Sequence, residues 1–197
     1  GESGRAAIVR CVAAIAGNNT APMITALDSE GNTALMRAAM SGNTDTLQAM
    51  IAQCVANGVA VSSILNRSNT AGQTALILAI AHGKSADCVR VLLANGADPD
   101  TRVMSSGLSA LEVAMREGRL DILQALLEHP NIHISDRILT TVYDRDCTVA
   151  LYSKALEREP DLLSRKLPNG NSFAHWLAEH NVPALRDILS IAWKDGH

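Results

Sequence analysis

Apolar residues recur along this chain with the period of an α-helix. They do so in short segments that come in pairs. The second segment of the first pair is the clearest, because Leu47, Met50, Ile51 and Cys54 stand at i, i+3, i+4 and i+7 and share one helical face. A shorter segment rich in alanine and leucine precedes it, and a glycine separates the two. The pattern predicts helical hairpins, each with a single buried side.

A five-residue phrase opens the first helix of three successive pairs. Its copies are Gly31-Asn32-Thr33-Ala34-Leu35, Gly72-Gln73-Thr74-Ala75-Leu76 and Gly107-Leu108-Ser109-Ala110-Leu111. The first glycines of the copies are 41 and 35 residues apart, somewhat above the period of about 33 at which solenoids of helix pairs with a β-turn recur. A fourth copy begins at Asn169-Gly170-Asn171-Ser172. The chain is therefore predicted to be a repeat array.

Elementary helix chemistry accounts for the fixed letters of the phrase. A hydroxyl at its third position can accept a hydrogen bond from an orphaned amide of the first helical turn. The residues predicted to cap in this way are Thr33, Thr74, Ser109 and Ser172. The glycines predicted to end the first helix in a left-handed turn are Gly42, Gly83 and Gly118. The phrase therefore describes the fold more than the function.

With these residues in place, the units resemble ankyrin repeats. The middle unit matches that family's pattern best, from Asn69 through Gly72 and Thr74 to Gly96-Ala97-Asp98. The resemblance implies an all-α fold, an ankyrin-repeat solenoid of stacked helix-turn-helix units joined by hairpin-like loops. The repeats are divergent, since the family's histidine is kept only at His175 and residues 57–66 lengthen the connection after the first unit.

We expect one continuous array over residues 1–197. Its predicted parts are 1–27 (an N-terminal capping helix or partial repeat), 28–68, 69–103 and 104–134 (repeats), 135–166 (a degenerate repeat) and 167–197 (a C-terminal repeat or cap). The first part contains a helix-like stretch from Arg5 to Ala16, and the last helix is expected to start near Pro183. Because the phrase is lost between Ser135 and Glu159, an inserted functional element is an alternative for that segment.

Composition narrows the classes of partner. Aromatic residues make up 3% of the chain, so the core is predicted to be aliphatic and rich in alanine. The formal net charge of -3 offers no positive field for nucleic acid, and no stretch approaches the roughly 20 apolar residues that span a bilayer. The cysteines lie far apart in apolar patterns, which favours buried thiols over a zinc site. We expect neither nucleic-acid binding nor membrane insertion.

The sequence carries no complete catalytic motif. His129 and His133 have a metal-like spacing, but Pro130 and Asn131 between them favour a turn. Gly83-Lys84-Ser85 ends like a phosphate-binding loop, yet the first glycine of that motif would fall inside a predicted helix. We expect a protein that is not an enzyme and takes no metal or cofactor.

The candidate binding surface lies where the copies of the repeat disagree. In the first helix, leucine and the small residues face the core, so the positions beside the small residues point outward into a concave groove that also includes the hairpin tips. The predicted partner-binding residues are Ser29, Glu30, Asn32, Arg37, Met40, Ser41, Ala71, Gln73, Leu78, His82, Ser106, Leu108, Arg116, Glu117, Asn171, Trp176, Glu179 and His180. Trp176 and Arg37 are the expected anchors, because both residue types are enriched at interface hot spots. The alternatives are a Trp176 that packs against a C-terminal helix and an Arg37 that is merely solvated.

The predicted function is non-catalytic: an interaction scaffold that docks a partner protein or peptide of unknown identity on its concave face and hairpin tips. The alternative is a targeting or regulatory segment of a larger enzyme, or of a bacterial effector delivered to a host cell. Gly1-Glu2-Ser3-Gly4 supports that alternative, because it resembles an expression scar. The expected location is cytoplasmic, or the host cytoplasm for an effector. The oligomeric state stays open, with a monomer favoured.

Overall fold

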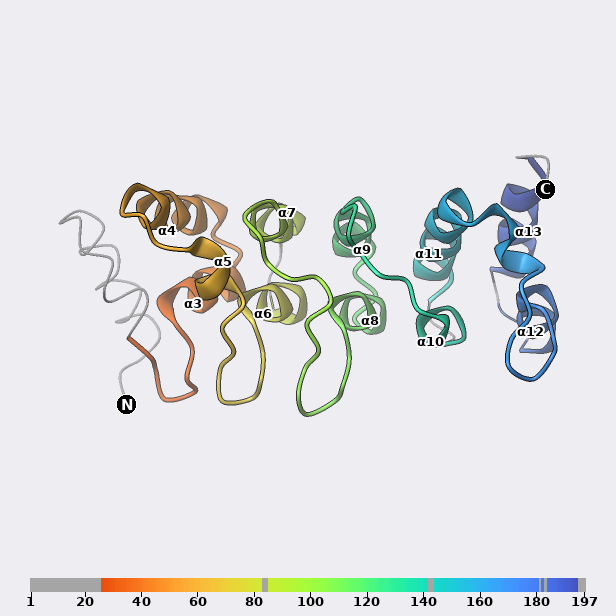
Figure 1. The fold of residues 1–197 in the computed structure, drawn as a ribbon, viewed down its shortest axis with the longest axis horizontal. Helices are drawn as coiled ribbons and strands as arrows, with labels where there is room; N and C mark the ends of the chain where they lie inside the picture. Colours follow the sequence, from red (N-terminus) through yellow and green to blue (C-terminus); the bar gives the residue numbers. More distant parts are fainter. Residues whose placement is uncertain (1–25, 83–84, 142–143, 181, 183, 195–197) are drawn as a thin grey trace. The chain divides into compact units, whose positions relative to one another are not determined.

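The computed structural model describes residues 26–82, 85–141, 144–180, 182 and 184–194. In this part the chain is helical, with no strand and with two isolated β-bridges, Arg102 to Ser109 and Lys166 to Ser172. The helices, drawn in Figure 1, are α3 (Ala34–Ser41), α4 (Thr44–Ala56), α5 (Val61–Leu65), α6 (Ala75–His82), α7 (Ala86–Ala94), α8 (Ala110–Arg116), α9 (Leu120–Leu127), α10 (Asp136–Leu139), α11 (Arg145–Arg158), the 3-10 helix η1 (Pro160–Leu163), α12 (Phe173–Glu179) and α13 (Leu185–Lys194). The predicted class of helix pairs joined by hairpin-like loops is confirmed.

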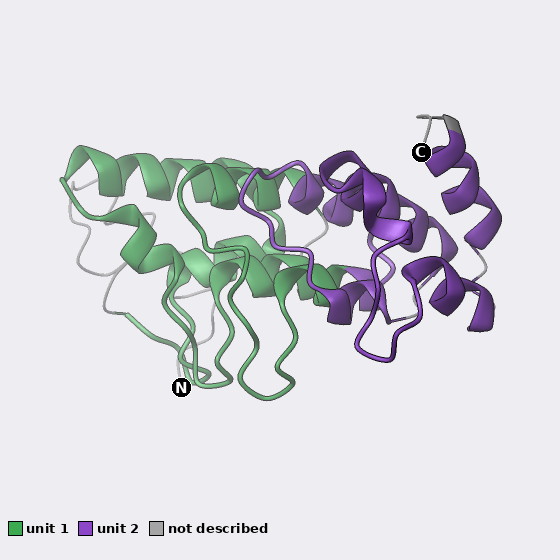
Figure 2. Cartoon of the chain, turned by 45° about the vertical axis from the view of Figure 1, so that its right-hand side comes forward, with its two compact units in different colours: residues 1–114 green, residues 115–197 purple. Residues whose placement is uncertain are grey.

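The chain divides into two compact units, residues 1–114 and 115–197 (Figure 2). The boundaries of the individual repeats inside the predicted array remain a prediction. Three expectations lie outside the described residues: the helix from Arg5 to Ala16, the turn at Gly83 and the helix start near Pro183.

The first helix pair shows why these residues form a hairpin. The Thr33 hydroxyl accepts a hydrogen bond from the Met36 amide, and Gly42 ends α3 with a φ of 72°, in the left-handed region that glycine tolerates. Asn43 then opens α4 by accepting a hydrogen bond from the Thr46 amide. The predicted hydroxyl caps are confirmed at Thr33, Thr74, Ser109 and Ser172, each of which accepts from the amide three residues later.

Unit 1 has two helix layers. The first helices α3 and α6 pack side by side, and so do the second helices α4 and α7 (Figure 1). Ala38, Ala39 and Ala79 are fully buried at this level, and their small side chains let the helix axes approach closely. Leu35, Leu47 and the other large aliphatic residues fill the space between the layers, and each such burial stabilises the fold by about 1.5–3 kcal/mol.

The long connection after α4 contains a helix that the sequence pattern does not predict. Helix α5 buries Ile64 and Leu65, which adds a small apolar contact to the second layer. Its C-cap residue Asn66 donates to the Gly96 carbonyl at 3.0 Å and accepts from the Asp98 amide at 2.8 Å. The connection is therefore anchored to the loop after α7, and α5 contains part of the residues that lengthen the spacing between the first two phrases.

Unit 2 is built around α11. This helix packs against α9 and α13, while η1 lies against both α11 and α12. The buried Tyr152 donates its hydroxyl to the Leu139 carbonyl at 2.8 Å, which ties α11 to the single turn of α10, and burial raises the pKa of that hydroxyl. The segment from Ser135 to Glu159 is thus a pair of one short and one long helix. The degenerate repeat expected in this segment, with an inserted functional element as its alternative, stays a prediction.

Candidate binding surface

The first hairpin, residues 28–32, is organised by one carboxylate. Oδ1 of Asp28 accepts hydrogen bonds from the backbone amides of Glu30 and Asn32, both at 2.9 Å. This is an Asx turn, in which a short polar side chain takes the place of a backbone acceptor. The side chain of Asp28 is only 1% exposed. The turn is therefore a fixed part of the structure, and Asp28 is not available to a partner.

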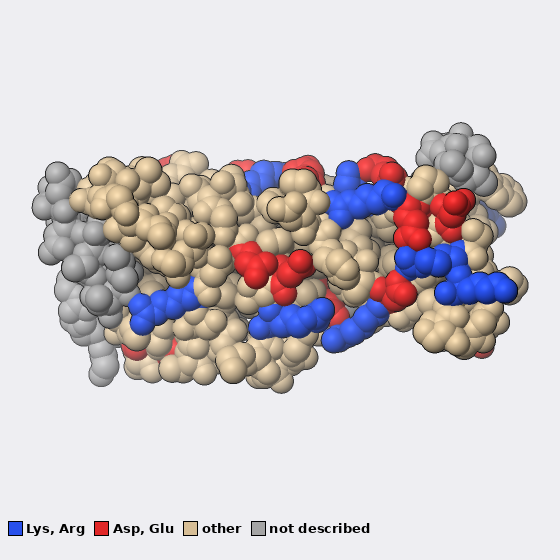
Figure 3. Space-filling model, viewed as in Figure 1, with Lys and Arg blue, Asp and Glu red and all other residues tan. Residues whose placement is uncertain are grey.

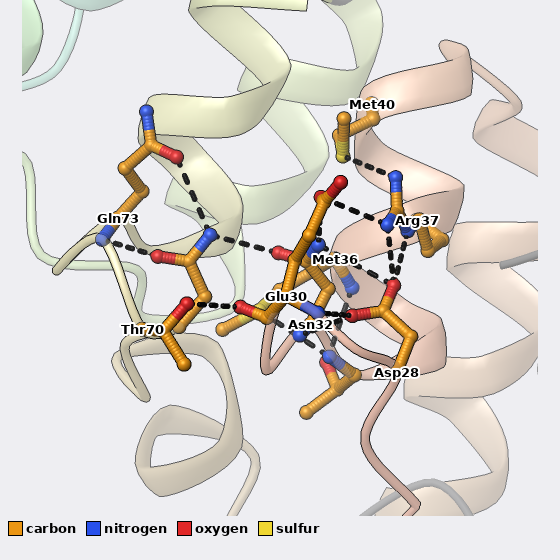
Figure 4. Close-up of polar contacts among 10 residues, drawn as sticks. Asp28, Glu30, Asn32, Met36, Arg37, Met40, Thr70 and Gln73 are labelled. Atoms are coloured by element: carbon orange, nitrogen blue, oxygen red, sulfur yellow. Dashed lines mark hydrogen bonds and ion pairs between the residues drawn. The ribbon is translucent and has the colours of Figure 1, made fainter. Parts of the chain in front are cut away.

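Arg37 joins this hairpin to α3 (Figure 4). Its Nε donates to Oδ2 of Asp28 at 2.5 Å, and its Nη2 donates to Oε2 of Glu30 at 2.9 Å. Its Nη1 also lies 3.8 Å from the Met40 sulfur. With 22% of the side chain exposed, the guanidinium is held by two carboxylates of its own chain. Arg37 is thus neither merely solvated nor a free anchor, because a partner would have to compete with these ion pairs.

The same contacts set the ionisation of Asp28. Burial works against the charged form, but hydrogen bonds from the Asn32 amide, the Arg37 side chain and the Glu30 amide outweigh it, so the pKa of Asp28 lies below its ordinary value. The carboxylate is therefore charged whenever the hairpin is folded near neutral pH. The ion pair with Arg37 then contributes to the stability of this end of unit 1.

The second hairpin, residues 69–73, repeats the turn and is bonded to the first. Oδ1 of Asn69 accepts from the amides of Ala71 and Gln73, as Asp28 does in the first hairpin. The Asn69 side-chain amide donates to Oδ1 of Asn32 at 2.8 Å. Thr70 donates its hydroxyl to the Glu30 carbonyl at 2.6 Å (Figure 4). Two consecutive hairpins are therefore held together by polar side chains and backbone.

The third hairpin, residues 103–108, is one residue longer than the first two. The Val103 amide donates to the Leu108 carbonyl, whereas the equivalent bonds in the earlier hairpins join residues four apart. The additional residue leaves Met104 83% exposed. Met104 lies so close to Gly72 that a Cβ added to this glycine would be 2.3 Å from the Met104 Cγ. A large apolar side chain thus covers the second hairpin and faces solvent.

The predicted site residues differ widely in exposure. The exposed ones are Ser29, Glu30, Ser41, Ala71, His82, Ser106, Arg116, Glu117, Asn171, Glu179 and His180. Those that are partly exposed are Arg37, Met40, Gln73 and Leu108. Asn32, Leu78 and Trp176 are buried, so the expectation that they face a partner needs correction. Leu78 is buried because α6 is apolar on every side and its first six residues are all covered.

Trp176 is 9% exposed, and its ring stacks on the imidazole of His180 with ring centroids 4.4 Å apart. His180 is held in place because its Nδ1 lies 2.9 Å from the Trp176 carbonyl oxygen. Trp176 is therefore a core residue of unit 2. The exposed tryptophan is instead Trp193, at 74%.

Sequence reasoning also missed Met104, although a signal was present. Met104 is a large apolar residue that precedes Ser105, Ser106 and Gly107 in a turn, and methionine suits adaptable binding surfaces because it is flexible and polarisable. Met104 stands three residues before Gly107, just as Asp28 stands before Gly31 and Asn69 before Gly72. This spacing therefore gives no sign of the additional residue in the third hairpin.

Other polar groups of the described residues also have defined surroundings. His175 Nδ1 lies 2.6 Å from the hydroxyl of Ser172, which caps α12. Burial raises the pKa of the thiols of Cys54 and Cys147. In the described ranges, no group of three metal-ligating side chains lies together, and no helix has the length and hydropathy needed to cross a membrane.

Charges of both signs are interleaved on the face drawn in Figure 3, without a field of one sign. Several charged side chains of unit 2 are paired, as Arg145 is with Asp187 at 2.6 Å and Arg165 with Glu159 at 2.7 Å. The hydrogen bond and ion pair with Asp187 raise the pKa of Arg145. Electrostatic attraction of a strongly charged partner to this face is therefore not expected.

Comparison with known proteins places this arrangement in a family. Residues 51–138 match the model for three copies of the ankyrin repeat, and residues 30–62 match the model for a single ankyrin repeat. The crystal structure of the ankyrin repeat protein EF0377 is similar over 93% of this chain and 96% of that chain, at 17% identity and a TM-score of 0.58.

Two solved complexes also contain similar chains. A chain in the structure of yeast ribosomal protein Rps3 with its chaperone Yar1 is 24% identical over 69% of this chain and all of that chain, with a TM-score of 0.56. A chain in the complex of the Bd0816 predatory endopeptidase from Bdellovibrio bacteriovorus with immunity protein Bd3460 is 31% identical, over 50% of this chain and 46% of that chain, with a TM-score of 0.41. The matched repeats together run from residue 30 to 138, which is more than half of the chain, and the chain belongs to the ankyrin repeat family.

Proposed function

We propose that this chain is a non-catalytic module that binds a partner protein through its hairpin tips and the outward residues of its first helices. Ankyrin repeats generally mediate protein–protein interaction. The residues of the repeated phrase serve the fold as caps and turns, which leaves the variable positions between them for recognition. The cytoplasmic location and the alternative of a regulatory segment in a larger enzyme remain predictions.

The observation that carries the proposal is the rigid support of exposed side chains in unit 1. Asn69 and Thr70 fix the second hairpin to the first, while Ser29 and Ala71 at the tips stay exposed. Met104 and Ser106 extend this exposed row on the third hairpin. A backbone that is already ordered loses little conformational entropy when a partner binds, which favours affinity.

The chemistry of this row favours a partner surface that is weakly charged and partly apolar. Ser29, Ala71 and Ser106 are small, and Met104 is flexible and polarisable, which suits irregular apolar surfaces. Arg37 offsets one of the two carboxylates that pair with it, Asp28 and Glu30, so this cluster keeps a single net negative charge. A weakly charged strip with one protruding apolar side chain, able to contact Met104, fits these features.

Site-specific photo-crosslinking tests the proposal with a matched pair of alanines. Ala71 is exposed on the second hairpin, and Ala52 is exposed on α4, in the other layer of unit 1. Benzoyl-phenylalanine is placed at one or the other position, the protein is irradiated in cell lysate, and adducts are identified by mass spectrometry. We expect a defined protein adduct from position 71 and none of the same mass from position 52.

The captured protein is then purified and titrated against variants. Met104→Ala and Ala71→Asp should each weaken binding about ten-fold or more, which corresponds to about 1.4 kcal/mol. Ala52→Asp should leave the affinity unchanged, and circular dichroism should show that all three variants are folded. Equal adducts from positions 52 and 71, or full affinity in both hairpin variants, would place the binding surface elsewhere.

A further inference from the structure

Unit 2 contains a pocket of its own, formed by residues 160–193. A pocket of about 420 Å³ is formed by η1, the start of α12 and the end of α13. Its walls are mostly apolar and include Leu163, Leu189 and Ala192. This volume lies within the range of about 300–1,000 Å³ that is usual for ligand pockets. The pocket is therefore large enough for one long side chain of a partner.

Trp193 forms one wall of the pocket and is exposed. Tryptophan is seldom left in water, because it carries a large apolar surface. At 74% exposure, Trp193 contributes little to the core of unit 2. The residues Leu185, Leu189 and Trp193 follow one another at helical spacing on α13 and also line an adjoining apolar pocket of about 390 Å³. The aromatic face is thus available to a ligand from outside.

Asp161 supplies the only charge among the residues that line the larger pocket. In the described part of unit 2, its backbone carbonyl accepts hydrogen bonds, but its carboxylate has no hydrogen-bond or ion-pair partner. The neighbouring acids differ, since Glu159 and Asp136 are both paired with Arg165. The pocket thus combines an exposed, unpaired carboxylate, apolar walls and an exposed tryptophan ring. These features suit a ligand that carries a cationic head on an apolar stem.

We propose that this pocket binds an arginine side chain of a partner protein. The methylene stem lies against Leu163 and Leu189, and the guanidinium lies between the Asp161 carboxylate and the face of Trp193. Arginine suits both groups, because its planar head can pair with a carboxylate and stack on an aromatic ring, while its stem covers apolar surface. An aliphatic side chain fits less well, because it would desolvate Asp161 without giving it a partner.

The charge of Arg186 opposes this binding. Arg186 is exposed on α13 and lines the adjoining pocket beside Trp193. It does not line the proposed arginine pocket, so the repulsion acts across the ring and is partly screened by solvent. Removal of this charge in Arg186→Gln should therefore strengthen arginine binding modestly, and the effect should shrink as salt concentration rises.

The test uses the full chain labelled with ¹⁵N and a capped pentapeptide, acetyl-Gly-Ser-Arg-Ser-Gly-amide. The indole N–H signals of Trp176 and Trp193 are distinct probes, because one ring is buried and the other is exposed. We expect the Trp193 signal to shift with a dissociation constant of about 1 mM, as for a single side-chain contact of about 4 kcal/mol. The same peptide with citrulline, which keeps the shape and loses the charge, should bind about ten-fold more weakly or not at all.

Matched variants separate the pocket from general charge effects. Asp161→Asn should weaken arginine-peptide binding about ten-fold, whereas Asp146→Asn, which removes an exposed charge elsewhere in unit 2, should not. Trp193→Phe should retain part of the affinity that Trp193→Ala loses. Dispersed amide spectra verify that each variant is folded. Equal binding of the citrulline peptide, or an unchanged affinity in Asp161→Asn, would overturn the proposal without affecting the hairpin surface of unit 1.

Discussion

The side-chain amide of Asn69 donates a hydrogen bond to the side-chain oxygen of Asn32, 2.8 Å away and 37 residues earlier in the chain. Both residues also belong to the turns of their own hairpins, since Asn69 holds the second turn and Asn32 closes the first onto Asp28. This one hydrogen bond therefore holds the two turns in a fixed position relative to each other.

Substitution of Asn69 should lower the free energy of unfolding. Asn69→Ala leaves the amides of Ala71 and Gln73 and the oxygen of Asn32 without their partner, which should cost about 1–3 kcal/mol. Asn69→Asp keeps the turn acceptor and loses the bond to Asn32, so its cost should be smaller. Urea denaturation followed by circular dichroism measures both. Asn57→Ala is the control, because its side chain makes one exposed bond at the end of α4, and a cost equal to that of Asn69→Ala would contradict the prediction.

The Asp28 turn should make stability depend on pH. Because the folded pKa of Asp28 is lowered, its contribution is fully present above the unfolded pKa, near 4, and is lost as the pH falls through the folded value. The wild-type chain should therefore be more stable than Asp28→Asn at pH 7, and the difference should narrow on acidification. Urea midpoints measured from pH 7 to pH 3 test this expectation. A constant difference over that range would show that Asp28 acts through packing and not through its charge.

The contact between Gly72 and Met104 should make Gly72 the more sensitive of two glycines. Gly72 and Gly107 have similar positive φ values, 72° and 66°, so alanine at either position should cost about 1–2 kcal/mol in backbone strain. At Gly72 the new methyl group would also meet the Met104 side chain, whereas at Gly107 it meets nothing within 4 Å. Gly72→Ala should therefore cost a further 1–3 kcal/mol, roughly the effect of overpacking. Met104→Gly should remove most of that difference in thermal unfolding experiments.

The two tryptophans should respond in opposite ways to truncation. Trp176→Ala removes a buried ring and its stack on His180, so it should destabilise unit 2 by about 3–5 kcal/mol. Trp193→Ala should change stability by no more than about 0.5 kcal/mol, because the ring is exposed. Chemical denaturation of both variants gives the comparison. A similar loss in both would mean that Trp193 is part of the core after all.

The helix pairs could be predicted because their signals are local. A hydroxyl cap such as Thr33, a left-handed glycine such as Gly42 and a one-sided apolar pattern act within a few residues of where they stand. Helix α5 could not be predicted in the same way, because a single apolar pair, Ile64 and Leu65, is too short to show a period. What stabilises α5 is the contact of Asn66 with the loop after α7, 30 and 32 residues away.

The exposure of the site residues depended on neighbours that the repeat pattern does not specify. The pattern placed Leu78 in the groove, but the first six residues of α6, from Ala75 to Ile80, are all buried. It made Arg37 an anchor, but Asp28 and Glu30 already hold its guanidinium. It missed Met104, because one additional residue in the third hairpin changes which side chain projects. Each of these differences concerns packing or pairing between residues of different turns or helices.

The support of the second hairpin through Asn69 and Thr70 has a consequence for how the protein can evolve. The Ala71 backbone is held by its amide bond to Asn69, while its exposed side chain has no role in the turn. Any residue except proline could therefore occupy position 71 at little cost to folding. A mutation at this tip can therefore change the affinity for a partner without lowering the stability of the fold. Natural selection or directed evolution can test new affinities there one substitution at a time.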